Sequence, residues 1–200
     1  MKTFEFWYDF SSPFSYLAAT QVEGLATRAG AQVVWRPFLL GGLFKMIGGP
    51  DVPMLTWPDP KRQHALRDMQ RHADLYAVPF RWPTRFPMST VTALRMALAA
   101  GERIVPLSLA IFRAYWGEDR DISDPSELAR LAESVGLPAS LVERAKDQEA
   151  KDALRRVTEQ AKERGFFGAP TFTVGDLTFW GQDRMNFVEK ALGGWRPASG

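Results

Sequence analysis

The sequence predicts an α/β fold in which an all-helical segment interrupts a small domain built around a sheet. The first observation is a short strand followed at once by a helix near the N-terminus, in Phe4–Leu17. The second is a pair of strands joined by a two-residue turn, with a proline just before them, in Gly165–Trp180. The third is the middle of the chain, where apolar residues recur at helical spacing.

The N-terminal strand is indicated by the placement of Phe or Tyr at every second position of Phe4–Tyr8. A helix begins at Ser12-Pro13, because serine caps free backbone N–H groups and proline tolerates the first helical position. Its apolar residues continue to about Gly30. Ser12 therefore lies at the N-terminus of a helix that leaves a strand, where an anion or a thiolate is stabilised. The alternative is that Ser12 is a helix cap and nothing more.

A second strand, parallel to the first, is predicted at Gln32–Phe38 and completes a β-α-β unit. A glycine-rich segment and a proline-rich loop follow and lead out of this unit. The next helix is predicted to start at Asp59. Further helices are predicted at Ser89–Ala100, Ile104–Tyr115, Ser123–Val135, Pro138–Asp147, Glu149–Arg164 and 183–192. We expect residues 1–45 and 151–200 to form one discontinuous domain and residues 46–150 to form a helical insert. The cleft between them is expected over Ser12.

Composition excludes several classes of function. The net charge of the 200 residues is +2, which gives no reason to expect nucleic acid as a partner. No apolar stretch approaches the roughly 20 residues that span a bilayer, so we expect no membrane association. The N-terminus starts directly with a strand and lacks the apolar region of a signal peptide. A cytoplasmic location is the expectation.

A strand and helix at the start, with X-Pro-Thr before a late hairpin, is the layout of the thioredoxin fold, in which that proline is cis and faces the active helix. Four segments carry a more specific resemblance, and they follow one another as Asp9–Tyr16, Arg36–Gly41, Gly168–Phe172 and Phe179–Arg184. On these segments the chain resembles the 2-hydroxychromene-2-carboxylate isomerase family, related to kappa-class glutathione transferases and DsbA-like oxidoreductases. The resemblance implies a thioredoxin-like fold with an inserted all-helical domain.

The absence of cysteine limits the chemistry of such a fold. If Ser12–Ser15 occupies the place of a Cys-x-x-Cys pair, the chain cannot itself perform dithiol–disulfide exchange, which needs an attacking thiolate. Such a site is either inert or takes its sulfur from a ligand, and glutathione is the obvious candidate. The resemblance likewise implies glutathione as cofactor, a small aromatic carboxylate as substrate, and a homodimer.

By resemblance, Ser12 is the catalytic serine, since the family places it immediately before the proline. We expect its hydroxyl to donate to the glutathione sulfur rather than to attack, because no histidine lies nearby in the sequence to act as its base. Ser11 is the near alternative. Ser15 is expected to make a hydrogen bond within the helix.

The remaining site residues come from the late hairpin and the segment after it. If Pro170 is cis, the backbone of Ala169 is exposed to the tripeptide. In the family, a polar pair matching Gln182 and Asp183 holds the γ-glutamyl end of glutathione, and Asp183 alternatively caps the last helix. The family often has an asparagine after the second strand, where this chain has Gly48–Asp51, so no contact is assigned there.

Two further sets of residues are candidates for a functional role. His64, Asp68 and His72 share one face of a predicted helix, but two histidines eight residues apart lie about 12 Å apart along its axis. We therefore expect a solvated face and no metal site. Trp7, Phe14 and Trp57 are candidates for an aromatic pocket.

Three functions agree with these features. The first is glutathione-dependent isomerisation of an aromatic-degradation intermediate by addition and elimination of a thiolate. The second is a kappa-like glutathione transferase acting on another electrophile, and the third is a non-catalytic glutathione-binding module. An isomerase needs glutathione catalytically, a transferase consumes it, and a binding module does neither.

Overall fold

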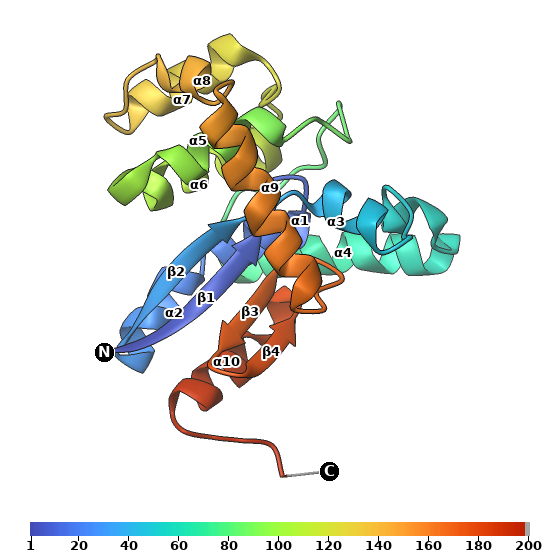
Figure 1. Ribbon diagram of the computed structural model, residues 1–200. Coiled ribbons are helices and arrows are strands. Elements are labelled where there is room, and N and C mark those ends of the chain that lie inside the picture. The colour runs from blue at the N-terminus through green and yellow to red at the C-terminus, as the bar shows by residue number, and fades with distance from the viewer. Residues whose placement is uncertain (199–200) are drawn as a thin grey trace.

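One mixed sheet organises the chain in the computed structural model, which describes residues 1–198. Its strand order is β2-β1-β3-β4. The strands are β1 (Lys2–Tyr8), β2 (Ala31–Pro37), β3 (Thr171–Val174) and β4 (Leu177–Trp180). β1 pairs in parallel with β2 and antiparallel with β3, which pairs antiparallel with β4. The N-terminal β-α-β unit and the C-terminal hairpin thus meet in one sheet, as predicted (Figure 1).

The two faces of the sheet are both covered by apolar packing. On one face, Phe6 stacks on Phe172 with ring centroids 5.4 Å apart, inside a core that continues into the helical part of the chain. On the other face, Trp7 packs against Phe38 and Phe166. Helix α9 (Gln148–Glu163) contacts β2 on this side and crosses the sheet in Figure 1. The second half of β1 is consequently enclosed on both faces.

The helical connection between β1 and β2 differs from the single helix that the sequence predicts. It consists of α1 (Pro13–Ala19) and α2 (Val22–Ala29). The break comes at Thr20, whose hydroxyl donates to the carbonyl of Leu17 at 2.7 Å. Threonine side chains compete in this way with the helical hydrogen-bond ladder. α1 is therefore only seven residues long.

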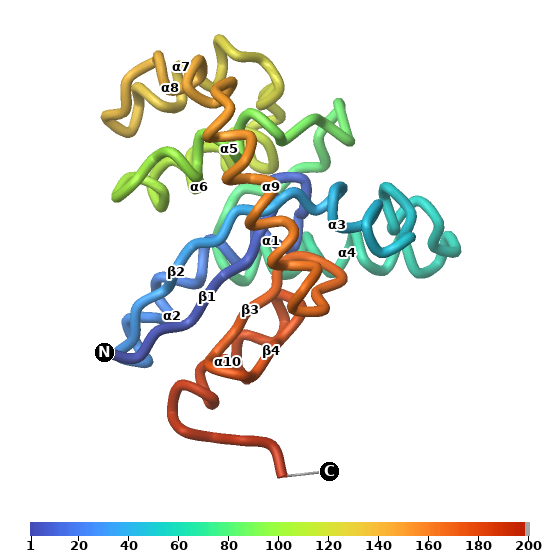
Figure 2. The backbone as a smooth tube through the Cα atoms, in the orientation of Figure 1, coloured from blue at the N-terminus to red at the C-terminus, as the bar shows by residue number. Residues whose placement is uncertain are grey.

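The chain leaves the sheet after β2 and returns along α9 (Figure 2). The elements between are α3 (Leu40–Met46), a 3-10 turn (Pro53–Thr56), α4 (Asp59–Leu75), α5 (Val91–Ala99), a 3-10 turn (Gly101–Arg103), α6 (Ile104–Phe112), a π-helical turn (Arg113–Gly117), α7 (Pro125–Ser134) and α8 (Leu141–Arg144). A 3-10 turn (Gln182–Arg184) and α10 (Met185–Leu192) end the fold. The prediction that the middle of the chain is helical is confirmed. The helix predicted at residues 138–147 is shorter, since only α8 forms there. The division of the chain into domains at residues 46 and 150 stays a prediction.

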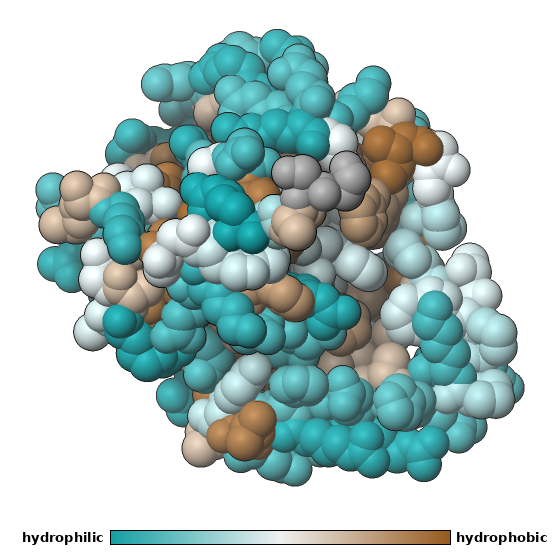
Figure 3. All heavy atoms as spheres, turned by 90° about the horizontal axis from the view of Figure 1, so that it is seen from below, coloured by the Kyte–Doolittle hydropathy of each residue, from teal (hydrophilic) through white to brown (hydrophobic). Residues whose placement is uncertain are grey.

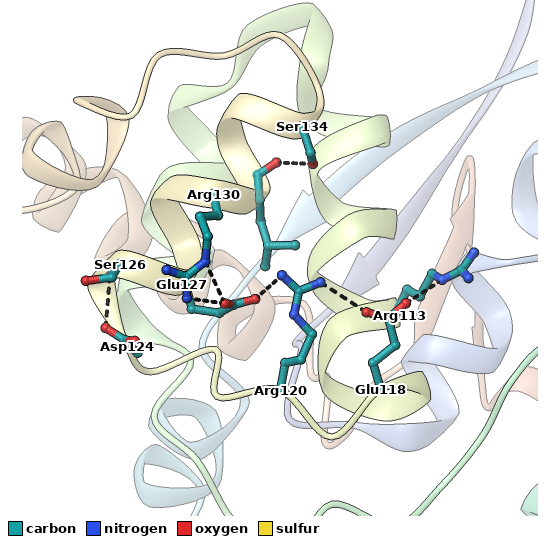
Figure 4. A network of polar contacts seen from close by, with 9 residues as sticks. Arg113, Glu118, Arg120, Asp124, Ser126, Glu127, Arg130 and Ser134 are labelled. Carbon is teal, nitrogen blue, oxygen red and sulfur yellow. Dashed lines mark hydrogen bonds and ion pairs between the residues drawn. The ribbon is translucent and has the colours of Figure 1, made fainter.

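A buried carboxylate of α7 pairs with the segment that follows the π-helical turn. The Glu127 side chain is only 8% exposed and pairs with Arg120 and, at 2.6 Å, with Arg130. Figure 4 shows Glu127 between these two arginines, with Arg120 reaching on to Glu118. A buried charge is tolerated when it is fully paired. The network therefore fixes the segment that follows the π-helical turn.

Among residues 1–198, no helix combines the length and the apolar character that crossing a membrane requires.

Candidate active site

Ser12 is the N-cap residue of α1, as the sequence predicts, and it is only 4% exposed. Its hydroxyl oxygen accepts a hydrogen bond from the backbone N–H of Ser15 at 3.1 Å. The same hydroxyl donates to the carbonyl of Ala169 at 2.9 Å. Ser12 is thus a cap that also contacts the C-terminal half of the chain, so the interpretation as a cap alone is incomplete.

The Ala169–Pro170 peptide bond is cis, as predicted from the sequence. The loop that contains it is held from both ends. Thr171 donates its hydroxyl to the carbonyl of Gly168 at 2.8 Å, and the backbone N–H of Gly181 donates to the carbonyl of Pro170 at 3.0 Å. The Phe86–Pro87 bond is cis as well, which the sequence did not indicate.

The hydrogen bond between Pro170 and Gly181 has a consequence for the polar pair that follows. Because Gln182 is the next residue, it is held beside the cis-proline loop, and the turn that contains it also contacts α1. Four of the five predicted site residues therefore lie in one continuous chain of contacts: Ser12, Ala169, Pro170 and Gln182.

The polar pair itself is asymmetric. Gln182 is buried, and its Oε1 accepts a hydrogen bond from the hydroxyl of Tyr76 at 3.2 Å. The Asp183 side chain is 53% exposed and pairs with Arg184. Asp183 does not cap α10, whose N-cap residue is Arg184 without a side-chain cap bond. The capping interpretation of Asp183 is wrong, and its carboxylate faces solvent beside the site.

Sequence reasoning missed Asp9 as a determinant of this site. Its carboxylate is buried, and its two oxygens accept the backbone N–H of Ser11 at 2.9 Å and of Leu40 at 2.7 Å. Burial raises the pKa of Asp9, while these N–H groups act in the opposite direction. Asp9 thereby joins the loop before Ser12 to the first residue of α3. The available signal was an acid inside the otherwise aromatic segment Trp7–Phe10.

The three aromatic residues that are candidates for a pocket lie in different surroundings. Trp7 is buried on the α9 side of the sheet, with Arg36 and Arg164 over its ring, so it lines no pocket. Phe14 packs against the main core. Trp57 lies under the ammonium of Lys61, 4.4 Å from its ring centroid.

The neighbouring histidine face carries no metal cluster. His72 Nδ1 lies 2.9 Å from the backbone oxygen of Asp68 on α4. Within the part of the chain that the structure describes, no three acidic or histidine side chains are grouped to hold an ion.

Two cavities lie away from Ser12. One of about 130 Å³ is lined by α5, α8 and the start of α9, and one of about 290 Å³ lies beside the end of α10. The face in Figure 3 is largely hydrophilic and is hollowed on its right-hand side, the side on which α3 and α4 lie in Figure 1.

Comparison with known proteins gives a consistent result. The model of the DsbA-like thioredoxin domain matches residues 3–193. The chain is 34% identical to the 2-hydroxychromene-2-carboxylate isomerase of Sphingobium xenophagum, over 96% of this chain and 98% of that one. It is 27% identical to glutathione S-transferase kappa 1 of Rattus norvegicus, over 96% and 91%. A solved 2-hydroxychromene-2-carboxylate isomerase structure superposes with a TM-score of 0.83 at 28% identity, covering 96% of this chain and 95% of that one.

Proposed function

The chain is an enzyme of the DsbA-like thioredoxin-domain family, in the group that includes 2-hydroxychromene-2-carboxylate isomerases, and from this premise we propose that it is a glutathione-dependent isomerase of that type. The substrate class is a small aromatic carboxylate from aromatic degradation, interconverted between cis and trans forms. Ser12 is the catalytic residue, and Ala169, Pro170, Gln182 and Asp183 bind glutathione.

The observation that carries the proposal is the Ser12 hydroxyl, buried against the Ala169 carbonyl in a chain without cysteine. The residues present fit the tripeptide. A thiolate needs a donor, which the Ser12 hydroxyl supplies, and we assign the partners of the ligand's peptide backbone to the cis-proline loop, whose Ala169 carbonyl contacts Ser12. The charged γ-glutamyl end needs polar partners, which Gln182 and Asp183 supply. Because the chain has no cysteine, no thiol of its own competes for this place.

When bound, glutathione supplies a thiolate that adds to the conjugated, ring-opened acid and leaves again after the former double bond has rotated. The part of Ser12 is to stabilise the charged sulfur. A hydrogen bond to a charged group contributes about 1.5–3 kcal/mol, which lowers a thiol pKa by about 1–2 units. Because α1 has only seven residues, we assign this effect mainly to the hydroxyl and less to the helix dipole.

The kappa-class relative supports a second candidate, a glutathione transferase acting on another electrophile. The two reactions differ in the fate of the thiol.

We also propose a homodimer and a cytoplasmic location, on the resemblance to the isomerase relatives.

The test is turnover of 2-hydroxychromene-2-carboxylate with and without glutathione, with free thiol measured throughout. An isomerase requires glutathione and leaves its concentration unchanged, whereas a transferase depletes it. A binding module shows neither reaction but a raised melting temperature, because a ligand that binds only the native state stabilises it. Turnover at the same rate without glutathione contradicts the proposal.

A further inference from the structure

One hydrogen bond joins the helical middle of the chain to the polar pair of the site. Tyr76 follows the last residue of α4, and its hydroxyl donates to Oε1 of Gln182 at 3.2 Å, across 106 residues of sequence. The ring is positioned by the end of the helix. Ala77 adopts a left-handed φ of 53°, and Val78 N–H donates to the carbonyl of Ala73 at 3.0 Å, so the chain turns away directly after Tyr76.

The direction of this hydrogen bond determines which end of the Gln182 amide is free. A side-chain amide has an accepting oxygen and a donating NH₂ group, and their positions are exchanged by a flip of the amide. Burial, and then the negative charge of Asp183, raises the pKa of Tyr76, so its hydroxyl stays protonated at neutral pH and keeps a proton to donate, although its oxygen is also able to accept. The acceptor that the structure gives this hydroxyl is Gln182 Oε1.

The NH₂ group of Gln182 is then left for a ligand. Within residues 1–198, the structure gives Nε2 no hydrogen-bond partner, although the residue is only 4% exposed. The neighbouring Asp183 carboxylate faces solvent. A donor amide and a carboxylate on adjacent residues match a ligand group that carries both a carboxylate and an ammonium, which is the chemistry of an amino-acid head.

We propose that Tyr76 is a positioning residue that holds the Gln182 amide with its NH₂ group toward the α-carboxylate of the γ-glutamyl residue, while Asp183 receives the α-ammonium. This inference rests on the proposed glutathione site. It adds Tyr76, the residue that follows α4, to that site and assigns different parts of the ligand head to the two members of the polar pair. In the flipped orientation, Oε1 faces the ligand carboxylate and repels it.

The experiment compares three ligands by calorimetric titration of the full chain. They are glutathione, glutaryl-Cys-Gly, which lacks the α-ammonium, and 4-aminobutanoyl-Cys-Gly, which lacks the α-carboxylate. For Tyr76→Phe we expect binding of glutathione and of glutaryl-Cys-Gly to weaken by about 2- to 10-fold, the usual effect of one hydrogen bond. Binding of 4-aminobutanoyl-Cys-Gly stays unchanged. A merely structural role of Tyr76 affects all three ligands alike.

Two further variants sharpen the result. Tyr115→Phe is the matched control, because it removes a hydroxyl whose contact is the backbone N–H of Met88, and we expect unchanged binding of all three ligands. If Tyr76 acts through the amide, Tyr76→Phe weakens binding no further once Gln182→Met is present.

The outcomes separate the two proposals. If the wild type does not bind glutathione, the proposed function and this inference both fall. If the wild type binds and Tyr76→Phe changes none of the three affinities, or changes all three equally, the inference is overturned and the proposed function stands.

Discussion

The hydroxyl of Ser12 and the carbonyl of Ala169 are joined by a hydrogen bond of 2.9 Å between residues 157 positions apart. A serine hydroxyl has one proton, so it cannot donate to this carbonyl and to a thiolate at the same time. Binding of a thiolate at Ser12 therefore requires the hydroxyl to turn away from Ala169. The carbonyl that is released becomes available to an N–H group of the ligand, which offsets the lost contact.

Ser12→Ala tests both roles of this residue. Loss of the cap bond to Ser15 is expected to lower the free energy of unfolding by about 0.5–2 kcal/mol. Loss of the donor is expected to raise the thiol pKa of bound glutathione by about 1–2 units. Turnover at neutral pH then falls by about 10- to 100-fold. Thiolate absorbance titrated in the bound state, together with urea unfolding, measures the two effects separately.

Ser11→Ala is the matched control for this titration, because the backbone N–H that Ser11 donates to Asp9 is retained in alanine. Its thiol titration is expected to follow the wild type. Superimposable titrations for wild type and Ser12→Ala leave Ser12 as a cap and remove it from the chemistry.

Replacement of Ser15 by alanine is expected to stabilise the protein, whereas replacement of Ser12 destabilises it. Ser15 is fully buried in α1, and its Oγ has no hydrogen-bond partner. The expected bond within the helix is thus absent at this hydroxyl. An unsatisfied buried polar group is costly, and alanine favours the helix, so Ser15→Ala is expected to raise the free energy of unfolding by about 0.5–1.5 kcal/mol. Urea unfolding of wild type and variant measures it.

The turnover rate of Ser15→Ala shows in addition whether the hydroxyl takes part in the site. Unchanged turnover with raised stability leaves Ser15 outside the site. Raised stability with lowered turnover indicates that the hydroxyl is kept free for a ligand. A destabilised variant contradicts the unsatisfied state of Oγ.

Asp9→Asn tests the buried carboxylate that joins Ser11 to Leu40. An amide has one accepting oxygen, so one of the two backbone N–H groups loses its partner, at a cost of about 1–3 kcal/mol. Burial raises the pKa of Asp9 above its unfolded value. The unfolded chain therefore releases the proton first as pH rises, and the stability contributed by Asp9 declines between its unfolded and its folded pKa.

The asparagine variant has no such titration. We expect the difference in stability between wild type and Asp9→Asn to be largest at acidic pH and to shrink as pH rises through this window, as measured by urea unfolding over a pH series. Parallel pH profiles for the two proteins contradict a raised pKa.

The sequence predicted those parts of the site that depend on local pattern. Ser12-Pro13 predicted a capped helix start, and Ala169-Pro170 before a hairpin predicted the cis-proline loop, since both signals lie within a few residues. The Tyr76–Gln182 and Asp9–Leu40 contacts join segments far apart in the chain, and no periodicity relates them. Nothing in a single sequence indicates such pairs.

The break between α1 and α2 was missed for a different reason. The apolar spacing continues through Thr20, but its hydroxyl bonds to Leu17 and ends the helix. A side chain that competes for a backbone carbonyl leaves the hydrophobic pattern unchanged. The capping interpretation of Asp183 failed in a similar way, because aspartate is a residue type that often caps helices and yet its side chain here pairs with Arg184.

Gly168→Ala tests the packing that supports the Ala169 carbonyl. A Cβ at residue 168 overlaps Nε1 of Trp180, whose side chain is half exposed and packs on Phe167 with ring centroids 5.0 Å apart. Overpacking typically costs about 1–3 kcal/mol, against a gain of about 0.4–1 kcal/mol from the stiffer unfolded chain. We therefore expect Gly168→Ala to destabilise the protein modestly and to weaken glutathione binding, because the loop that presents Ala169 shifts.

In a Trp180→Ala background the clash is gone, so Gly168→Ala is expected to become neutral or stabilising by about 0.4–1 kcal/mol. The double-mutant cycle, measured by urea unfolding, then gives an interaction energy of about 1–3 kcal/mol between the two positions. Glutathione affinity measured on the same four proteins shows whether relief of the clash also restores the loop. If Gly168→Ala has the same effect on stability in both backgrounds, the two substitutions are additive. In that case the indole of Trp180 does not clash with a Cβ at residue 168, and it is not the reason for the glycine.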